Sequence, residues 1–409
     1  MRLLPGLRRA ALLLSLLGLA HTLWHGLDEP GVALAFGLLM VVGELSRGRG
    51  VQGREAAPLG AAGALAYALL GENDGRPTGH GVLQVVAVVV AAALLGCVPH
   101  VARGCGSTVD HLTRRVLTAA FAALCFQPLY NRGRLLEWSG PSYVLLLVAL
   151  LVVTALCDAV LAAAMAHSRT RWPFGPLLRD ELRALPGIGA AVCATGVVMA
   201  LAVGVVGLWA LPVFSLPLLL AQLSFRRYAA VRTTYRQTIA SLARATEIAG
   251  YTPAGHARRV AVLSREVGRE LGLGESDLTV LEYAALMHDI GQLSLVDPVP
   301  GGATAGLPAA EQRRIALLGG AVVRQTGVDA EVAVVVERQA DPYREQPVGA
   351  RIVRAVNAYE EKVREAGPGG PLRALAELRL GTARDYHPEV VESLARVLSR
   401  DCLTLPEVG

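Results

Sequence analysis

Eight apolar stretches fill the first 225 residues of the chain, and they restrict its fold more than any other feature. They occupy residues 1–27, 31–46, 57–71, 81–102, 116–131, 142–165, 187–208 and 210–225. A membrane-spanning helix needs about 20 apolar residues, with about 17 as a lower limit. Only 18% of the 409 residues are charged, against about 25% in ordinary globular proteins. We therefore expect a polytopic bundle of about eight membrane helices over residues 1–225.

The loops between these stretches predict an orientation. The first stretch follows a basic start, MRLLPGLRR, and fits a retained first helix or a signal peptide; we favour the retained helix. Arginine-rich loops, such as SRGRGVQGRE and HSRTRWPFGPLLRDELR, alternate with weakly charged ones. The positive-inside rule then places both termini in the cytoplasm of a multi-pass plasma-membrane protein. The net charge of +5 thus indicates membrane orientation and not nucleic-acid binding.

Asp158 stands out because it is an ionisable residue inside the sixth apolar stretch, LLVVTALCDAVLAAA. Such a carboxylate is costly and often functional, but single polar residues also hold membrane helices together. We favour the structural role and keep a functional site at Asp158 as the alternative. The six cysteines have no paired spacing, which indicates neither a disulfide framework nor a zinc site.

Residues 226–250 form a connector that runs without proline from the last apolar stretch into the soluble half. Its composition predicts one continuous helix. Apolar side chains recur at spacings of three and four, among them Tyr228, Val231, Tyr235 and Ile239. Such a stripe packs against a second copy of the chain or against the chain's own soluble domain, and the sequence does not choose between them. A homodimer through this helix is therefore an expected partner, beside the membrane.

Residues 251–400 carry a series of amphipathic helical patterns and no sustained alternation with period two. Glycine and proline separate the patterns, most densely in DPVPGGATAGLP. We expect an all-α cytosolic domain over residues 251–400, followed by a tail at 401–409. The predicted fold class is all-α for the whole chain. The predicted helices centre on Val260, Leu281, Ile315, Val335, Val356 and Leu394.

Three residues of this domain have the chemistry of metal ligands. His256 begins one predicted helix after the turn TPAG, and His288–Asp289 ends another in LEYAALMHDIGQL. Imidazole and carboxylate groups suit a divalent cation such as Zn²⁺, Mn²⁺, Fe²⁺ or Mg²⁺. Adjacent helical residues point about 100° apart, so His288 and Asp289 can reach one ion only near a helix end. Gly291 is well placed to end that helix.

The segment YTPAGHARRVAVLSREVGRELGLGESDLTVLEYAALMHDIGQL resembles the start of an HD-superfamily phosphohydrolase domain, in particular of the HD-GYP branch. The resemblance resumes at VGARIVRAVNAYEEKV and DYHPEVVESLARVL and covers most of residues 235–400. It implies metal-dependent hydrolysis of phosphoesters, with cyclic di-GMP as the usual substrate of that branch. It also implies that His256, His288 and Asp289 hold metal. Membrane helices joined to such a domain are similar to bacterial membrane-bound sensors that act in signal transduction.

Other positions depart from the pattern of that family. Its later metal-binding aspartate aligns with Asn357, which lacks the charge that holds a hard cation. Its further histidines and glutamate fall at Leu318–Gly319 and on Glu337–Gln339. The lysine after Asp-Ile-Gly is Gln292, and the Gly-Tyr-Pro loop is shortened to ADPYREQP. The resemblance therefore supports at most one ion, with the ligands His256, His288, Asp289 and, weakly, Asn357.

Two functions follow for the soluble domain. The first expectation is a degenerate HD-GYP-like output domain, a pseudoenzyme that binds a ligand or regulates and does not hydrolyse cyclic di-GMP. The alternative is an active one-metal phosphohydrolase acting on a nucleotide or cyclic dinucleotide, with Asp289 as a catalytic residue. A third hypothesis places the main function in the membrane half, as a transporter or sensor that uses Asp158.

Overall fold

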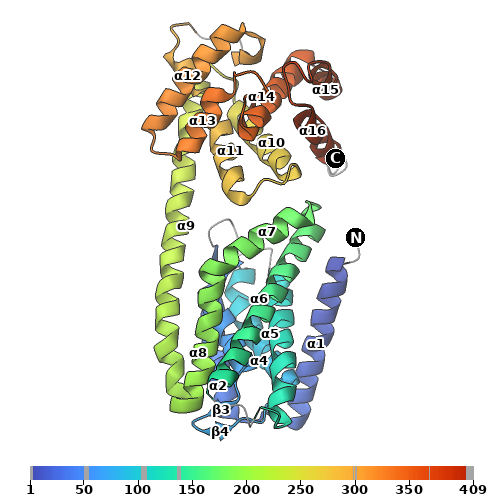
Figure 1. Cartoon of the computed structure of the whole chain (residues 1–409), viewed down its shortest axis with the longest axis vertical. Helices are drawn as coiled ribbons and strands as arrows, with labels where there is room; N and C mark the ends of the chain where they lie inside the picture. Colours follow the sequence, from blue (N-terminus) through green and yellow to red (C-terminus); the bar gives the residue numbers. More distant parts are fainter. Residues whose placement is uncertain are drawn as a thin grey trace. The chain divides into compact units, whose positions relative to one another are not determined.

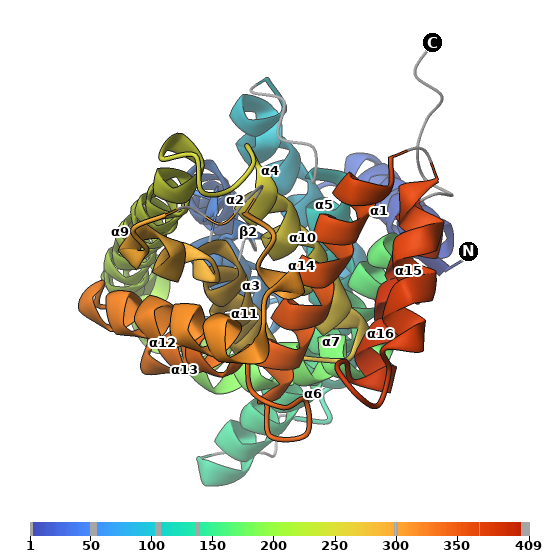
Figure 2. The ribbon, with the colours of Figure 1, turned by 90° about the horizontal axis from the view of Figure 1, so that it is seen from above.

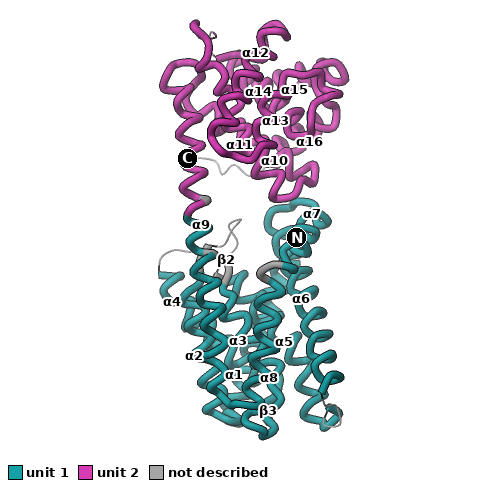
Figure 3. The backbone as a smooth tube through the Cα atoms, turned by 60° about the vertical axis from the view of Figure 1, so that its left-hand side comes forward, with its two compact units in different colours: residues 1–230 teal, residues 231–409 magenta. Residues whose placement is uncertain are grey.

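The computed structural model describes residues 3–49, 55–102, 108–135, 140–297, 299, 302–367 and 369–401. The chain divides into two compact units, residues 1–230 and 231–409, which Figure 3 shows in teal and magenta. Both units are built from helices, so the predicted all-α class is confirmed. The strands among the described residues form two short antiparallel pairs, β1 (Gly48–Arg49) with β2 (Glu55–Ala56) and β3 (Glu72–Asn73) with β4 (Arg76–Pro77).

The apolar stretches of the sequence coincide with helices of the first unit (Figure 1). An additional helix, α7 (Phe174–Ala184), lies in a segment that we expected to be a loop, and a short π-helical turn (Leu185–Gly189) follows it. The other helices are α1 (Leu3–His25), α2 (Pro30–Leu45), α3 (Pro58–Ala68), α4 (Val82–Ala102), α5 (Thr108–Asn131), α6 (Pro141–Thr170), α8 (Ala190–Val206) and α9 (Ala210–Ile248).

Four helical stretches in the described part of the chain are long and apolar enough to cross a membrane. They are α1, α4, α6 and the run from α8 into α9. The helix α2 has 16 residues and α3 has 11, which is short for a span of about 20. The helix α5 carries Asp110, Arg114 and Arg115 in its first turns. The structure thus supports membrane association with four candidate spans, and the expected count of about eight is not confirmed.

In the second unit, α14 (Val348–Ala366) passes between the pair α12–α13 and the pair α15–α16, as Figure 2 shows. Its buried face joins a core that includes Val260, Leu281, Val336 and Leu394. All the helices predicted from periodicity are present, and α15 was not predicted. The remaining bounds are α10 (His256–Glu270), α11 (Glu275–Met287), α12 (Ala309–Gln325), α13 (Ala330–Arg338), α15 (Gly370–Leu380) and α16 (Pro388–Asp401), with short 3-10 helices at η4 (Ile290–Ser294) and η6 (Thr304–Gly306).

The apolar stripe of the connector divides into two parts along α9. Ile239 and Ala243 are buried in the core of the second unit, and Tyr235 packs against that core. Val231, which lies two turns before Ile239 on the same helix, is 65% exposed. Packing on the chain's own domain therefore accounts for the later part of the stripe and leaves the earlier part uncovered.

Candidate metal centre

Two chain segments bring His256, His288 and Asp289 together in the second unit. Gly255 adopts a left-handed conformation with φ of 74° and turns the chain so that His256 is the first residue of α10. The helix α11 ends at Met287, and His288 and Asp289 occupy the turn before η4. One potential ligand atom from each of the three side chains lies within 4.8 Å of the others. All three residues are buried, which is unusual for so polar a group unless its members are paired or hold an ion.

His288 uses one ring nitrogen for a backbone hydrogen bond and turns the other toward Asp289. Its Nδ1 atom lies 2.7 Å from the carbonyl oxygen of Ala285 and donates to it. Its Nε2 atom forms an ion pair with Asp289 Oδ2 at 3.0 Å, without the geometry of a hydrogen bond. Both atoms are buried, and the described residues offer neither of them another hydrogen-bond partner. An ion held by both atoms would take the place of the proton between them. The donor set therefore fits a divalent metal ion.

Electrostatics couple the three side chains. Burial alone would lower the pKa of His288, but the neighbouring Asp289 carboxylate outweighs burial and raises it to about 9. Burial alone would raise the pKa of Asp289, yet His288 and His256 together lower it. Without metal, the pair is therefore an imidazolium beside a carboxylate at neutral pH.

Asn357 and Glu361, one turn apart on α14, complete the wall behind His256. The Oδ1 atom of Asn357 lies 3.0 Å from His256 Nε2, and its Nδ2 donates to Glu361 Oε1 at 2.9 Å. Glu361 is 2% exposed and accepts further hydrogen bonds from the backbone N–H groups of Thr304 and Ala305. Burial, reinforced by the charge of Asp289, raises the pKa of Glu361. The carboxylate that Asn357 lacks is thus present one turn further along the helix, where it fixes the orientation of the Asn357 amide.

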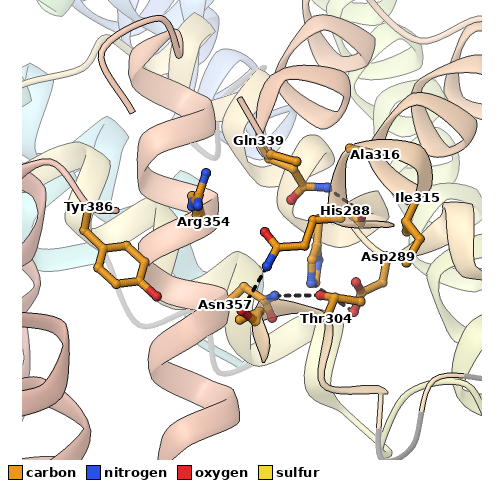
Figure 4. A pocket seen from close by; sticks show the side chains of 12 residues that line it. His288, Asp289, Thr304, Ile315, Ala316, Gln339, Arg354, Asn357 and Tyr386 are labelled. Atoms are coloured by element: carbon orange, nitrogen blue, oxygen red, sulfur yellow. Dashed lines mark hydrogen bonds and ion pairs between the residues drawn. The ribbon is translucent and has the colours of Figure 1, made fainter. Parts of the chain in front are cut away.

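A pocket of about 490 Å³, including space open to solvent, lies beside this cluster. Figure 4 shows His288 and Asp289 toward one end of it and Tyr386 at the other, with Arg354 between them. Arg354 and Glu361 were not predicted from sequence. Both lie on the same face of α14 as Asn357, three residues before it and four residues after it. Polar residues at this helical spacing are the feature of the sequence that could have pointed to them. The lining residues are His288, Asp289, Thr304, Ala305, Gln312, Ile315, Ala316, Gln339, Ala340, Arg354, Asn357 and Tyr386.

Gly291 has a different role from the one predicted. It does not end α11, which stops four residues earlier, and it lies in η4 against α12. A Cβ atom on Gly291 would lie 2.1 Å from the carbonyl oxygen of Ile315 and 2.7 Å from the backbone nitrogen of Gly319. The glycines at 291 and 319 therefore let two backbone segments touch directly. This contact occupies the place where the family pattern puts a further histidine.

The residues at Glu337–Gln339, where the family pattern has further histidines and a glutamate, make contacts with protein groups. Glu337 forms an ion pair with Arg324 of α12, and Arg338 donates to the carbonyl oxygen of Glu345. Gln339 does reach the pocket, but its Nε2 atom donates to the carbonyl oxygen of His288 at 2.8 Å. Gln292 is fully buried, so a lysine ammonium there would need a buried anionic partner. Among the described residues, one cluster, His256 with His288 and Asp289, could therefore hold an ion.

The polar residues of the first unit make a separate set of contacts. Asp158 on α6 accepts hydrogen bonds from Arg114 Nε at 2.8 Å and from Thr118 Oγ1 at 2.9 Å, both on α5. Glu44 on α2, which the sequence did not single out, lies 2.8 Å from His111 Nε2 on α5 and is 2% exposed. Each carboxylate thus links two helices, as expected for polar contacts between apolar helices.

Comparison with known proteins gives one result for this unit. Residues 254–361 match the family model described as HD domain, a range that includes His256, His288, Asp289, Asn357 and Glu361. HD domains typically bind a divalent metal ion, which agrees with the cluster of His256, His288 and Asp289. No curated protein and no solved structure matches the chain. The C-terminal unit therefore contains a segment, residues 254–361, that matches the HD domain family.

Proposed function

We propose that the chain is a membrane-anchored phosphohydrolase whose cytoplasmic HD domain uses one divalent metal ion. The observation that carries this proposal is the buried cluster of His256, His288 and Asp289, whose potential ligand atoms lie within 4.8 Å of one another beside a pocket that His288 and Asp289 line. A domain that had lost its metal site would be expected to replace such buried ionisable side chains, because burying them costs free energy in a folded protein.

The reaction is the hydrolysis of a phosphoester. A water oxygen forms a bond to phosphorus, the P–O bond to the alcohol breaks, and the alcohol leaves with a proton from the water. A divalent ion held by His256, His288 and Asp289 would supply Lewis-acid stabilisation of the phosphoryl oxygens. Gln339, through the carbonyl of His288, and Glu361, through Asn357, hold the ligand residues in place.

A non-catalytic, regulatory HD domain is the second candidate. The lack of a second metal site among the described residues favours it over a two-metal cyclic di-GMP phosphodiesterase. It differs from the first proposal in a measurable way, because a regulatory domain binds its ligand without turnover.

The two candidates are separated by metal analysis of the full-length protein in detergent. We expect about one equivalent of Mn²⁺, Fe²⁺ or Zn²⁺ in the wild type and in His387→Ala, and none in His288→Ala. Release of phosphate or alcohol from a panel of phosphomonoesters and diesters should follow the metal content. Metal without turnover of any ester would support the regulatory domain. A wild-type protein that stays metal-free after incubation with these ions would contradict the one-metal phosphohydrolase.

Metal affinity should depend on pH with a defined sign. Because the raised pKa of His288, about 9, keeps its ring protonated at neutral pH, an ion must displace that proton. Affinity for Mn²⁺ is therefore expected to rise about tenfold per pH unit between pH 6 and pH 8 and to level off above pH 9. Titrations of the full-length protein at several pH values measure this slope, and a flat profile would contradict a protonated His288.

We also propose that two copies associate through the early part of α9. The exposure of Val231 on a helix whose later positions are buried supports this pairing. In membranes, Val231→Cys is expected to crosslink two copies on mild oxidation, whereas the buried control Ile239→Cys should not exceed the wild-type background. A non-reducing gel measures both, and equal amounts of dimer in the two variants would contradict the proposal.

A further inference from the structure

Arg354 places a cationic group in the pocket without a carboxylate partner. It lies one turn before Asn357 on α14, and its Nη1 atom donates to the backbone carbonyl of Asp341 at 2.8 Å. No other hydrogen bond or ion pair of Arg354 is found among the described residues. One edge of the guanidinium is therefore anchored, while the remaining N–H groups are available to a ligand.

Tyr386 adds a neutral donor at the far end of the same pocket. The turn that carries it is strained, because Ala383 adopts a left-handed conformation with φ of 63° and donates its N–H to the carbonyl of Tyr386. The Tyr386 hydroxyl makes no hydrogen bond to the rest of the described chain. A tyrosine hydroxyl is protonated at neutral pH, and burial raises the pKa of Tyr386 further.

We propose that Arg354 and Tyr386 form the phosphate-recognition half of the pocket and select phosphomonoesters over phosphodiesters. This inference rests on the proposed hydrolase function and names its substrate class. A guanidinium binds phosphate best through two parallel N–H···O contacts. With a further oxygen directed to an ion at Asp289, the phosphate needs three non-bridging oxygens, which a monoester has and a diester lacks.

The pocket is small. Its volume of about 490 Å³ includes space open to solvent, and the part enclosed by protein is well below the range of about 300–1,000 Å³ of typical small-ligand pockets. The first two residues of the loop after α13, Gln339 and Ala340, line the pocket. Gln346 fixes the shape of this loop, because its Nε2 atom donates to the carbonyls of Gln339 and Asp341. A compact phosphomonoester therefore fits this space better than a cyclic dinucleotide.

Binding of simple probes to the full-length protein tests the assignment. Inorganic phosphate, phenyl phosphate and diphenyl phosphate are titrated calorimetrically, with and without Mn²⁺. In the wild type, we expect phenyl phosphate to bind at least about tenfold tighter than diphenyl phosphate. Arg354→Gln should weaken phosphate binding about 10- to 100-fold with unchanged Mn²⁺ affinity. Tyr386→Phe, which keeps the ring, should weaken it less, and the control Arg351→Gln should leave it unchanged.

The outcomes separate this inference from the proposed function. If the wild type binds no Mn²⁺ but still binds inorganic phosphate in a manner that requires Arg354, the metal site fails and the phosphate site stands. Equal binding of monoester and diester overturns the inference. Phosphate binding that both Arg354→Gln and Tyr386→Phe leave intact also overturns it.

Discussion

Replacing Gly291 with alanine is expected to unfold the part of the HD domain around α12 while the rest of the chain stays folded. The new Cβ atom would lie 2.1 Å from the Ile315 carbonyl oxygen and 3.1 Å from Gly319 Cα, and both of these atoms belong to the backbone. Side-chain rotation cannot relieve such contacts, so α12 as a whole must move. Overpacking of a core typically costs about 1–3 kcal/mol and sometimes more, and we expect at least about 3 kcal/mol here because backbone must shift.

Hydrogen exchange of α12 peptides in the full-length protein measures this loss. The matched control is Gly306→Ala, since no heavy atom lies within 4 Å of the position of its Cβ and its φ is not positive. We expect fast exchange of α12 in Gly291→Ala and wild-type protection in the control. Equal protection in the two variants would show that α12 moves away at little cost, against the close packing described above.

Gly291 also shows how far the sequence alone could lead. A glycine after a helical pattern is typical of a helix end, and local spacing contains nothing to distinguish that role from contact with a distant backbone. The partner, Gly319, lies 28 positions later in a helix whose apolar face was predicted from periodicity. Helices are predicted from local pattern, whereas the contact between them depends on the three-dimensional arrangement.

The residues of the candidate site could likewise be predicted from the sequence only in part. His256, His288 and Asp289 could be singled out because their spacing and a resemblance to a known family both indicate metal chemistry; as ligands of one ion they stay a prediction. Arg354 and Glu361 were not predicted, because the family pattern does not mark them and their helical spacing from Asn357 alone does not indicate a function. Their relevance follows from a face of α14 that turns toward the pocket and the metal cluster. Likewise, the apolar stretches predicted helices correctly, but the short lengths of α2 and α3 and the charged first turns of α5 leave four candidate spans in the described part of the chain.

Replacing Asn357 with aspartate is expected to strengthen metal binding and to weaken the metal-free domain. The Asn357 Oδ1 atom faces His256 Nε2 at 3.0 Å, next to the candidate ion site, so a carboxylate there would add a charged oxygen ligand. We expect at least about a tenfold gain in Mn²⁺ affinity, equal to about 1.4 kcal/mol. The same change removes the Nδ2 donor and sets a carboxylate against Glu361, whose oxygen lies 2.9 Å from that nitrogen. The metal-free domain should lose about 1–3 kcal/mol of stability.

The double variant Asn357→Asp/Glu361→Gln separates the two effects. Its glutamine amide can donate to the new aspartate from the position of Glu361 Oε1, while the glutamine oxygen keeps the hydrogen bond from the backbone N–H of Ala305. The backbone N–H of Thr304, which bonds Oε1 in the wild type, loses its acceptor. We expect the double variant to keep the gain in Mn²⁺ affinity and to recover part of the stability of the metal-free domain, measured by hydrogen exchange of α14 in the presence of a chelator. Glu361→Gln alone, which adds no ligand, should not tighten metal binding. If Asn357→Asp binds Mn²⁺ no better than the wild type in either background, position 357 does not face the ion, and the site is limited to His256, His288 and Asp289.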